Sequence, residues 1–482
     1  MVKEVSEKEV GKASEVDEKR VKPEEKENKM GTMPMSKLLM SMSLPMICSM
    51  LVQALYNVVD SVFVSRIVDD IDVAADSGTA ALNGVGMAFP FQTLLIAFGT
   101  GTCVGVNAIL SKALGEKDQN TVEKSAHNGI FLCFLNYLLF LIIGVFFSEI
   151  LIKSQGGDGL SLSYGSDYLR IICLGSIFVY IQLMFERLLQ STGRTIYTMF
   201  TQGIGAVINI VLDPILIFGL FGAPELKVKG AAIATITGQF VAAILAVVIN
   251  VLKNPEIHLS IKKIKPDFKI IGRIYSVGLP SIVMQAIGSV MTFNMNKLLD
   301  SLNKDSVAVF TVYFKVQSLF FMPIFGLNNG MVPILAYNYG AKKRDRMVSV
   351  IKRTMFVAFC FLLVGFIAFE TIPDKLLLIF KTGNESLITL GVPAFRMIAV
   401  HFLLAWFCII GLTVFQALGN GIYSLIIAVA RQLIILLPVA NILARIGGLN
   451  LIWWCFPIAE LMSFALTAIF LYRINKKIIS KV

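Results

Sequence analysis

The feature that most constrains the fold of this chain is a series of long apolar segments separated by short polar stretches. Each segment has about 20–30 residues, enough for an α-helix to cross a hydrocarbon layer of roughly 30 Å with some tilt. A helix also satisfies its own backbone N–H and C=O groups, which a lipid environment requires. The sequence therefore predicts an all-α polytopic membrane protein with twelve transmembrane helices, at 37–65, 83–113, 121–152, 163–191, 195–222, 229–253, 270–302, 306–338, 345–373, 387–418, 420–444 and 449–475.

The composition agrees with this class and excludes a soluble domain. Of 482 residues, 56% are hydrophobic and only 16% are charged, and the mean hydropathy is +0.75. The net charge of +11 does not indicate nucleic-acid binding, because the surplus of Lys and Arg lies in loops between apolar segments. No cofactor motif is visible. We expect a chain surrounded by a lipid bilayer, with no nucleic-acid partner and no cofactor.

The distribution of Lys and Arg predicts how the chain is oriented, since cytoplasmic loops carry an excess of these residues. The loops after the sixth and eighth apolar segments are basic, and the carboxyl-terminal tail adds Arg473, Lys476, Lys477 and Lys481. The first loop is acidic instead, with Asp69, Asp70, Asp72 and Asp76. Both termini are therefore expected on the cytoplasmic side of the plasma or inner membrane.

An internal repeat divides the chain into two halves. At a constant offset of 225 residues, four positions of the first half return in the second: Gln92, Gly101, Gly105 and Gly115 as Gln317, Gly326, Gly330 and Gly340. The pair Leu44-Pro45 near the opening of the first segment returns as Leu279-Pro280 near the opening of the seventh. Both halves have six segments of the same orientation, which predicts two pseudo-symmetric six-helix lobes related by an axis along the membrane normal.

The expected organisation follows from this repeat and from the polar ends. The first 29 residues are rich in Glu and Lys and have few apolar side chains, none of them aromatic, Leu or Ile, which is typical of a disordered segment. We expect a charged, disordered cytoplasmic tail at 1–36, a first lobe at 37–253, a basic cytoplasmic linker at 254–269, a second lobe at 270–475 and a cytoplasmic tail at 476–482.

The fifth apolar segment contains Asn209 and Asp213, one helical turn apart and therefore on the same face. A carboxylate at that depth costs roughly 2.5–3.5 kcal/mol on insertion scales. Asp213 is therefore expected to face the bundle interior, a water-filled cavity or a partner. A structural Asp, hydrogen-bonded to a neighbouring helix, is the alternative.

Three more segments of the first half have polar side chains along one face: Gln53, Asn57 and Asp60 in the first, Gln182, Glu186 and Gln190 in the fourth, and Thr235 and Gln239 in the sixth. Such faces can converge on one internal site. Three carboxylates in a chamber of low dielectric constant cannot all ionise cheaply, so at least one should take a proton or Na⁺. The alternatives are a solvated helix end for Asp60, an interfacial position for Glu186 and a bond to its own helix backbone for Thr235.

The second half has no comparable group of carboxylates, so ion coupling is expected in the first half. Glu460 could pair with Arg431, although their spacing does not require it. The chain has 20 Met and 35 Phe, some of which could line a pliable apolar cavity suited to flat cationic ligands.

Four motifs, in this order, resemble the MATE (multidrug and toxic compound extrusion) family, most closely its MepA-like bacterial branch. They are Gln53-Ala-Leu-Tyr-Asn-Val-Val-Asp60, Gln190-Ser-Thr-Gly193-Arg-Thr, Asn209-Ile-Val-Leu-Asp213-Pro214 and Gly230-Ala-Ala-Ile-Ala-Thr235. The resemblance covers about residues 36–475. It does not extend to the charged amino-terminal tail, nor to the second-lobe acidic residues of the NorM-like branch.

The resemblance implies a V-shaped pair of six-helix lobes and cation-coupled drug export by alternating access. The positions that match the family's first-lobe ion and proton site are Asp60, Glu186, Asn209, Asp213 and Thr235. Gln53, Asn57 and Gln190 complete the expected ion-coupling and substrate-binding set, and Pro45 is the expected hinge of the first helix. If Na⁺ is the coupling ion, its expected ligands are Asp60, Asn209, Asp213 and Thr235.

We therefore expect a secondary active transporter, not an enzyme: a monomeric antiporter that exports small organic cations while H⁺ or Na⁺ enters. One alternative is a lipid-linked precursor flippase of the same superfamily, which would need a basic central cavity for a pyrophosphate, whereas the first half is acidic. Another is a non-transporting membrane receptor or scaffold, which would need neither the repeat nor convergent carboxylates within the membrane.

Overall fold

The computed structural model describes residues 27–64, 67, 77–260, 264–378 and 385–481. The helices of the first half are α2 (Lys29–Thr32), α3 (Met35–Val64), α4 (Ser77–Glu116), α5 (Gln119–Ser154), α6 (Gly159–Leu174), α7 (Ser176–Ser191), α8 (Thr195–Phe218), the 3₁₀ turn η1 (Leu220–Gly222) and α9 (Lys227–Lys253). Those of the second half are α10 (Phe268–Leu302), α11 (Lys304–Gly340), α12 (Arg344–Thr371), α13 (Pro373–Leu378), α14 (Glu385–Ala399), α15 (Phe402–Ala417), α16 (Gly421–Val429), the π-helical turn η3 (Ala430–Leu436), α17 (Leu437–Gly447), α18 (Leu449–Ile452), α19 (Cys455–Lys477) and the 3₁₀ turn η4 (Ile479–Lys481).

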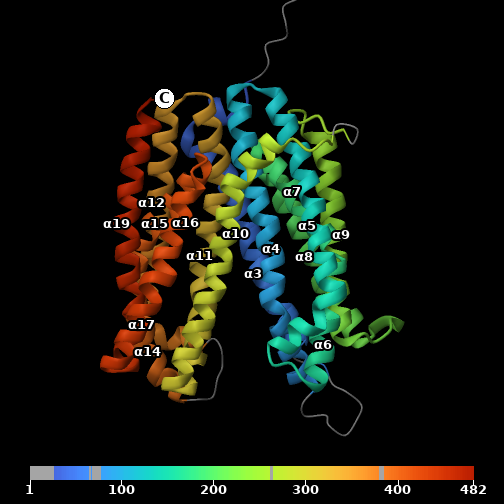
Figure 1. Ribbon diagram of the computed structural model, residues 1–482, viewed down its shortest axis with the longest axis vertical. Helices are drawn as coiled ribbons and strands as arrows, with labels where there is room; N and C mark the ends of the chain where they lie inside the picture. The colour runs from blue at the N-terminus through green and yellow to red at the C-terminus, as the bar shows by residue number, and fades with distance from the viewer. Residues whose placement is uncertain (1–26, 65–66, 68–76, 261–263, 379–384, 482) are drawn as a thin grey trace, which may run out of the picture.

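The predicted class, an all-α polytopic membrane protein, is confirmed. Within the described ranges, ten helices are long and apolar enough to cross a membrane, or up to twelve if each of two bent helix pairs is one span. In Figure 1 the long helices run side by side along the vertical axis, and α3, α4, α10 and α11 lie between the outer helices of the two halves. The acidic first loop falls outside the described residues.

The predicted spans 163–191 and 387–418 are not single straight helices. The first is divided into α6 and α7, which meet at 48°, and the second bends by 53° between α14 and α15. At the first break, a Cβ on Gly175 would lie 2.3 Å from Ile236 Cδ1 of α9, so only glycine fits against that helix. Glycine is also among the weakest helix formers, which helps explain why the helix is interrupted there.

Two hydrophobic clusters form the interior, and they do not divide the chain exactly where the sequence suggested. One is built from α4 to α9 but also takes Ile270 and Ile274 from α10. The other is built from α11 to α19 but also takes Met35, Leu38 and Met42 from α3. The first turns of α3 and α10 therefore pack against the opposite half, and both helices cross between the clusters.

The glycines of the sequence repeat mark the places where these helices cross. A Cβ on Gly105 of α4 would lie 2.2 Å from the carbonyl oxygen of Ile274 in α10. At the equivalent position of the second half, a Cβ on Gly330 of α11 would lie 2.4 Å from Ser43 Oγ in α3. Any larger residue would force the helices apart, so the repeat preserves two symmetric close contacts.

The last glycine pair of the repeat joins the two halves directly. A Cβ on Gly115 would lie 2.0 Å from the carbonyl oxygen of Tyr337, and one on Gly340 would lie 2.0 Å from that of Lys112. The carboxyl-terminal ends of α4 and α11 therefore touch backbone to backbone. We call this the sealed end; it is the end at which the carboxyl terminus lies (Figure 1).

Pro45 lies inside α3, which continues through it as one helix. Proline has no backbone N–H, so the carbonyl of Ser41 loses its usual helical donor. The hydroxyl of Thr195, at the start of α8, lies 3.5 Å from that carbonyl oxygen. The helix therefore has a weakened turn where it passes from one hydrophobic cluster to the other.

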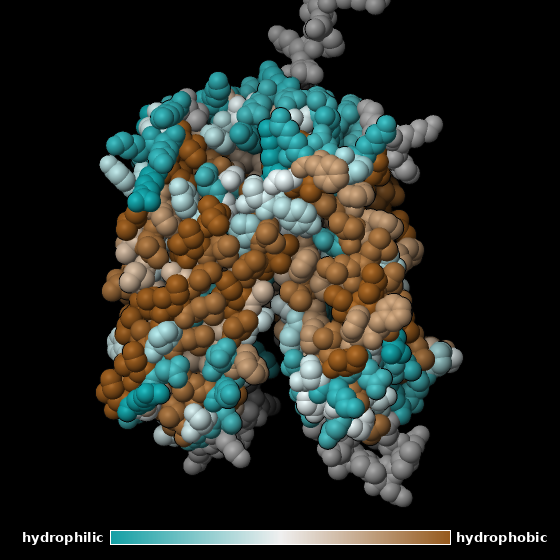
Figure 2. Space-filling view, in the orientation of Figure 1, coloured by the Kyte–Doolittle hydropathy of each residue, from teal (hydrophilic) through white to brown (hydrophobic). Residues whose placement is uncertain are grey.

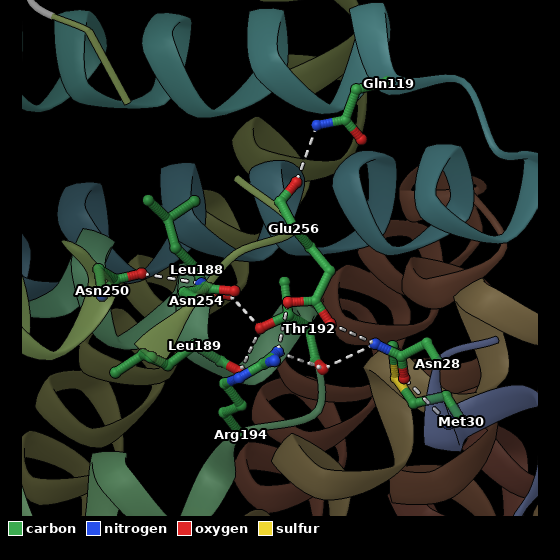
Figure 3. A network of polar contacts seen from close by, with 10 residues as sticks. All are labelled: Asn28, Met30, Gln119, Leu188, Leu189, Thr192, Arg194, Asn250, Asn254 and Glu256. Atoms are coloured by element: carbon green, nitrogen blue, oxygen red, sulfur yellow. Dashed lines mark hydrogen bonds and ion pairs between the residues drawn. The ribbon is translucent and has the colours of Figure 1, made fainter. Parts of the chain in front are cut away.

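Residues 27–33, which we call the clasp segment, depart from the disordered tail expected at 1–36. Asn28 Nδ2 donates to the carbonyl of Thr192 and to Glu256 Oε1, each at 3.1 Å. Glu256 also forms an ion pair with Arg194 at 2.6 Å, and its carbonyl accepts from Gln119 Nε2 at 2.9 Å (Figure 3). These bonds attach the clasp segment to the first half at the sealed end.

The second half holds the same segment through α11 and α12. Asn338 Nδ2 donates to the carbonyl of Met30 at 3.0 Å. Arg346 Nη2 donates to the carbonyls of Met30, at 3.0 Å, and Met33, at 2.8 Å. The side chain of Met30 is fully buried. Buried apolar surface and backbone carbonyls that need donors thus order a segment whose composition alone suggests disorder.

An ion pair between Lys343 and Glu27 adds to this attachment. The hydrogen bond from Lys343 lowers the pKa of Glu27 below its ordinary value of 4.5. Because the carboxylate must be ionised to pair, its contribution is complete above that ordinary value and is lost as the pH falls through the lowered pKa. The attachment is therefore intact at neutral pH.

Replacing Arg346 by Ala should weaken the attachment of the clasp segment to the second half, leaving the bonds from Asn338 and Lys343. A hydrogen bond from a charged group is worth roughly 1.5–3 kcal/mol, so losing two should speed amide exchange in residues 29–36 by more than about tenfold. Hydrogen–deuterium exchange of the purified protein measures this. Arg344→Ala is the matched control, because Arg344 is exposed. Equal exchange in both variants would contradict the importance of the Arg346 contacts.

Candidate functional site

The first half brings together three of the predicted polar residues near its centre. Asn209 and Asp213 lie on α8, as predicted, and Asn209 Nδ2 is 3.3 Å from both Asp213 Oδ1 and Thr235 Oγ1 of α9. Asp213 is fully buried and Asn209 is 3% exposed. Asp60 of α3 is near enough for its charge to repel that of Asp213. Three helices thus contribute to one cluster, which we call the aspartate cluster.

Oxygen atoms of this cluster lack donors. Among the described residues, no hydrogen bond reaches Asp60 Oδ1, Asn209 Oδ1 or Asp213 Oδ2, although all three atoms are buried. A buried polar atom without a partner costs free energy, and a buried charge without one costs more. The cluster can reduce that cost by taking a proton on a carboxylate or a cation among these oxygens. No group of three or more His, Cys, Asp or Glu side chains placed to hold a metal ion exists in the described part of the chain.

Two tyrosines that the sequence reasoning missed lie beside the aspartate cluster. Tyr56 of α3 is hydrogen-bonded to Gln53, and the charges of Asp60 and Asp213 act on its hydroxyl. The Tyr168 hydroxyl of α6 donates to Gln92 Oε1 at 3.4 Å. The spacing of Tyr56, four residues before Asp60, was a signal that could have included it. The side chain of Asn57 lies outside the described residues.

Glu186 forms a separate, fully bonded group. It is 1% exposed, so it does not occupy an interfacial position. Its carboxylate accepts from Gln182 Nε2 at 3.1 Å, Thr201 Oγ1 at 2.8 Å and Gln202 Nε2 at 2.6 Å. The structure therefore joins the predicted polar faces of the fourth and fifth segments here, and not only at the aspartate cluster.

A cavity of about 140 Å³ connects these groups. Its lining includes Gln53, Glu186, Gln190, Asn209 and Thr235. Five of the eight residues predicted for ion coupling or substrate binding thus face one space between α3, α7, α8 and α9, while Asp60 and Asp213 are not among its lining residues.

A larger cavity of about 620 Å³, which we call the central cavity, lies mostly within the second half, where α10, α11, α15, η3 and α19 line it. Val104, Asn107 and Arg187 of the first half complete its wall. Figure 2 shows the molecule hollowed between the halves, at the end away from the carboxyl terminus. Four Phe and three Met side chains are among its lining residues, including Phe314, Phe321, Phe325, Met284 and Met322. Volumes of 300–1,000 Å³ with such linings are typical of drug-sized ligands.

The ionisable lining of the central cavity differs from the expectation drawn from the first half. It comprises Arg187, His401, Arg431 and Glu460, so the cavity is not acidic. Arg431 Nη1 and Glu460 Oε2 are 3.2 Å apart, which confirms the suggested pairing. Arg187 lines both cavities, and the sequence reasoning treated it only as a neighbour of Glu186.

Comparisons with known proteins agree with this architecture. The MatE family profile matches residues 45–215 and 280–442. The multidrug export protein MepA of Staphylococcus aureus is 26% identical over 446 residues, 92% of this chain and 95% of that protein. The protein of the same name from Staphylococcus haemolyticus is 26% identical over 445 residues, 92% and 94% of the two chains.

A solved structure described as the outward-facing conformation of a multidrug resistance MATE family transporter of the MOP superfamily has a TM-score of 0.85 to this chain. It is 23% identical and covers 95% of this chain and 99% of that one. The fold is therefore shared along nearly the whole chain. Together with the family match over both halves, this likeness places the chain: it belongs to the MatE family of multidrug efflux transporters, whose members are membrane transporters and not enzymes.

Proposed function

We propose that this chain is an antiporter that exports organic cations while H⁺ or Na⁺ enters, with the aspartate cluster as the coupling site. The observation that carries the proposal is the pair Asp60 and Asp213, from two helices, with the buried oxygens Oδ1 and Oδ2 lacking donors among the described residues. Burying two unneutralised carboxylates this close is costly, so the site favours uptake of a proton or a hard cation.

Substrate would bind in the central cavity. Flat organic cations suit its aromatic and Met side chains, and the unpartnered Oε1 of Glu460 is a carboxylate oxygen in its wall. This is the organic-cation class expected from the sequence. An antiporter needs one site for the cargo and a separate site for the ion. It also needs a mechanism that prevents both sites from being occupied at the same time.

The coupling would operate through α3. This helix carries Asp60 near one end and contacts the second half at the other, with Pro45 between them. Neutralising Asp60 and Asp213 removes their repulsion, which favours closer packing of α3 on α8. A bend at Pro45 would then narrow the space between the halves and expel the cargo.

The gradients supply enough free energy for such export. Each tenfold ion gradient is worth about 1.4 kcal/mol, and each charge moved through 100 mV about 2.3 kcal/mol. We propose further that the chain acts as a monomer in the cell membrane with both termini and the sealed end in the cytoplasm, since the basic loops lie at that end. The hollow of Figure 2 would then face outward.

Transport by purified protein in liposomes tests the proposal. We expect ethidium to move against its own gradient when a pH gradient or a Na⁺ gradient is imposed, and not in liposomes without protein. A response to the pH gradient alone identifies H⁺ as the coupling ion, and a response to Na⁺ alone identifies Na⁺. Folded protein that responds to neither gradient would contradict the antiport mechanism.

A further inference from the structure

We propose that His127 makes the linker a pH-sensitive element of the sealed end: the neutral ring of His127 attaches residues 254–260 to α5, and protonation of the ring releases them. Release also loosens the clasp segment, because Glu256 of the linker is bonded to Asn28. This device goes beyond the proposed export cycle, and it depends neither on the cargo nor on the coupling ion.

Both ring nitrogens of His127 have partners that fix their roles. Nδ1 lies 2.6 Å from the carbonyl oxygen of Glu123, one turn earlier in α5, and since a carbonyl can only accept, Nδ1 carries the hydrogen. Nε2 accepts from the backbone N–H of Ser260 at 3.0 Å. A ring that donates through one nitrogen and accepts through the other is neutral. His127 is 3% exposed, so this contact is closed to solvent while the linker is attached.

Protonation of this ring is incompatible with the contact to the linker. An imidazolium carries a hydrogen on both nitrogens, so Nε2 of His127 could no longer accept, and its N–H would face that of Ser260. Two buried donors would then lack an acceptor, which is costly. Attachment therefore requires the neutral ring: it is complete at high pH and is lost as the pH falls. Histidine is the side chain that ordinarily changes its charge between about pH 5 and 8.

The other charged groups around this ring do not account for a change in that range. Lys124 of α5 and Asp267 form an ion pair at 3.2 Å. Hydrogen bonds from the amide of Ile270 and from Lys124 hold the pKa of Asp267 below its ordinary value of 3.8. On the side of α4 and α7 the surroundings are apolar, because a Cβ on Gly129 would meet Met184 and Val106. The remaining ionisable residues of α5, the linker and the adjoining helix ends are Glu123, Lys253, Glu256, His258, Lys265, Lys269 and Arg273.

The linker is attached by several contacts, of which one depends on a histidine. Ile257 is 5% exposed and belongs to the hydrophobic cluster of the first half. Asn254 Nδ2 donates to Asn250 Oδ1 at 3.0 Å, and the N–H of Asp267 donates to Asn128 Oδ1 at 2.8 Å. These contacts keep the linker near α5 when the bond from Ser260 is lost. Protonation of His127 should therefore cause local release and not unfolding.

The clasp segment is coupled to this release through Glu256, four residues before Ser260. The carboxylate of Glu256 pairs with Arg194 at 2.6 Å and accepts from Asn28 Nδ2 at 3.1 Å, while its carbonyl accepts from Gln119 (Figure 3). When Ser260 is free, Glu256 is restrained from one side only. Asn28 then loses one of its two bonds to the first half and keeps the bond to the carbonyl of Thr192.

Hydrogen–deuterium exchange of the purified full-length protein tests the proposal, with rates corrected for the intrinsic pH dependence of exchange. Since a solvated histidine takes its proton near pH 6.5, wild-type protection of residues 256–260 should fall about tenfold from about pH 7.5 to about pH 5.5. In His127→Gln the fall should be less than about twofold, because an amide oxygen can accept from Ser260 at either pH.

His127→Phe fills the same space without an acceptor, so residues 256–260 should be poorly protected at both pH values. Exchange in the clasp segment should then be faster by about fivefold, as expected for one hydrogen bond. His258→Gln is the matched control, because His258 is exposed in the same linker and its replacement should leave the wild-type pH dependence unchanged.

Equal wild-type protection at the two pH values would overturn the proposal, and this result requires no variant. A tenfold fall that persists in His127→Gln would overturn it as well, because another group would then be responsible. Unchanged exchange of the clasp segment in His127→Phe would disprove the coupling through Glu256. The measurement involves no transport, so it stands or fails independently of the liposome experiment.

Discussion

Replacing Asp213 by Asn should reduce gradient-driven ethidium export to the level of liposomes without protein, while the protein remains folded. Asn keeps the shape of the side chain and can still bond to Asn209, but it cannot gain or lose a proton and offers a cation only a neutral oxygen. Because the change removes a buried charge, we expect the melting temperature to stay equal or to rise. Transport in liposomes and thermal unfolding of the same preparation measure the two effects.

Asp300→Asn is the matched control for this substitution. Asp300 is an exposed carboxylate on α10, in the other half of the chain, and its neutralisation should leave transport unchanged. Asp60→Asn should behave like Asp213→Asn, since both carboxylates belong to the aspartate cluster. Normal export by the Asp213 variant would remove this cluster from the coupling mechanism, whatever the result for Asp60.

Replacing Gly340 by Val should separate the ends of α4 and α11 and abolish transport. The new Cβ would lie 2.0 Å from the carbonyl oxygen of Lys112, a backbone atom that cannot move without its helix. Contacts under 3 Å are not tolerated, so the sealed end cannot form as it does here. Spin labels at Lys117 and Lys342, in the turns that follow the two helices, should report a longer distance in this variant than in wild type.

Gly272→Val is the control for that experiment. Gly272 lies on α10, and no heavy atom is within 4 Å of the position its Cβ would take. Gly340→Ala provides a smaller change if Val impairs folding, and it should lengthen the distance less. An unchanged distance in a folded Gly340→Val protein would mean that the contact between α4 and α11 does not hold the sealed end together.

The sequence was sufficient to predict the helical membrane class, the internal repeat and the neighbourhood of Asn209, Asp213 and Thr235, because these depend on hydrophobicity and on spacing within a helix. It could not predict that the first turns of α3 pack in the hydrophobic cluster of the second half and those of α10 in the cluster of the first half. That arrangement depends on packing between segments more than 200 residues apart, such as Gly330 against Ser43. The breaks in two of the spans were missed for the same reason, since Gly175 is understood only beside Ile236.

The polar residues show the same limit. Glu186 was assigned to a shared site from its position on α7, but its carboxylate is held by Thr201 and Gln202 of the next helix, which spacing within one helix does not reveal. The position of Arg187 in the walls of both cavities was missed, because a cation next to Glu186 in the sequence suggests an ion pair between the two. Residues next to each other on a helix point about 100° apart, so the two side chains have different partners.

The clasp segment has a mechanical consequence for any opening of the sealed end. Its bonds to the first half come from one side chain, Asn28, whereas the second half grips its backbone through Asn338 and Arg346. When the halves separate, the bonds of Asn28 to the first half should break first. The segment should then move together with α11 and α12. The clasp segment would then keep its position relative to the second half and change its position relative to the first. Opening would therefore be asymmetric, although the two halves have the same fold.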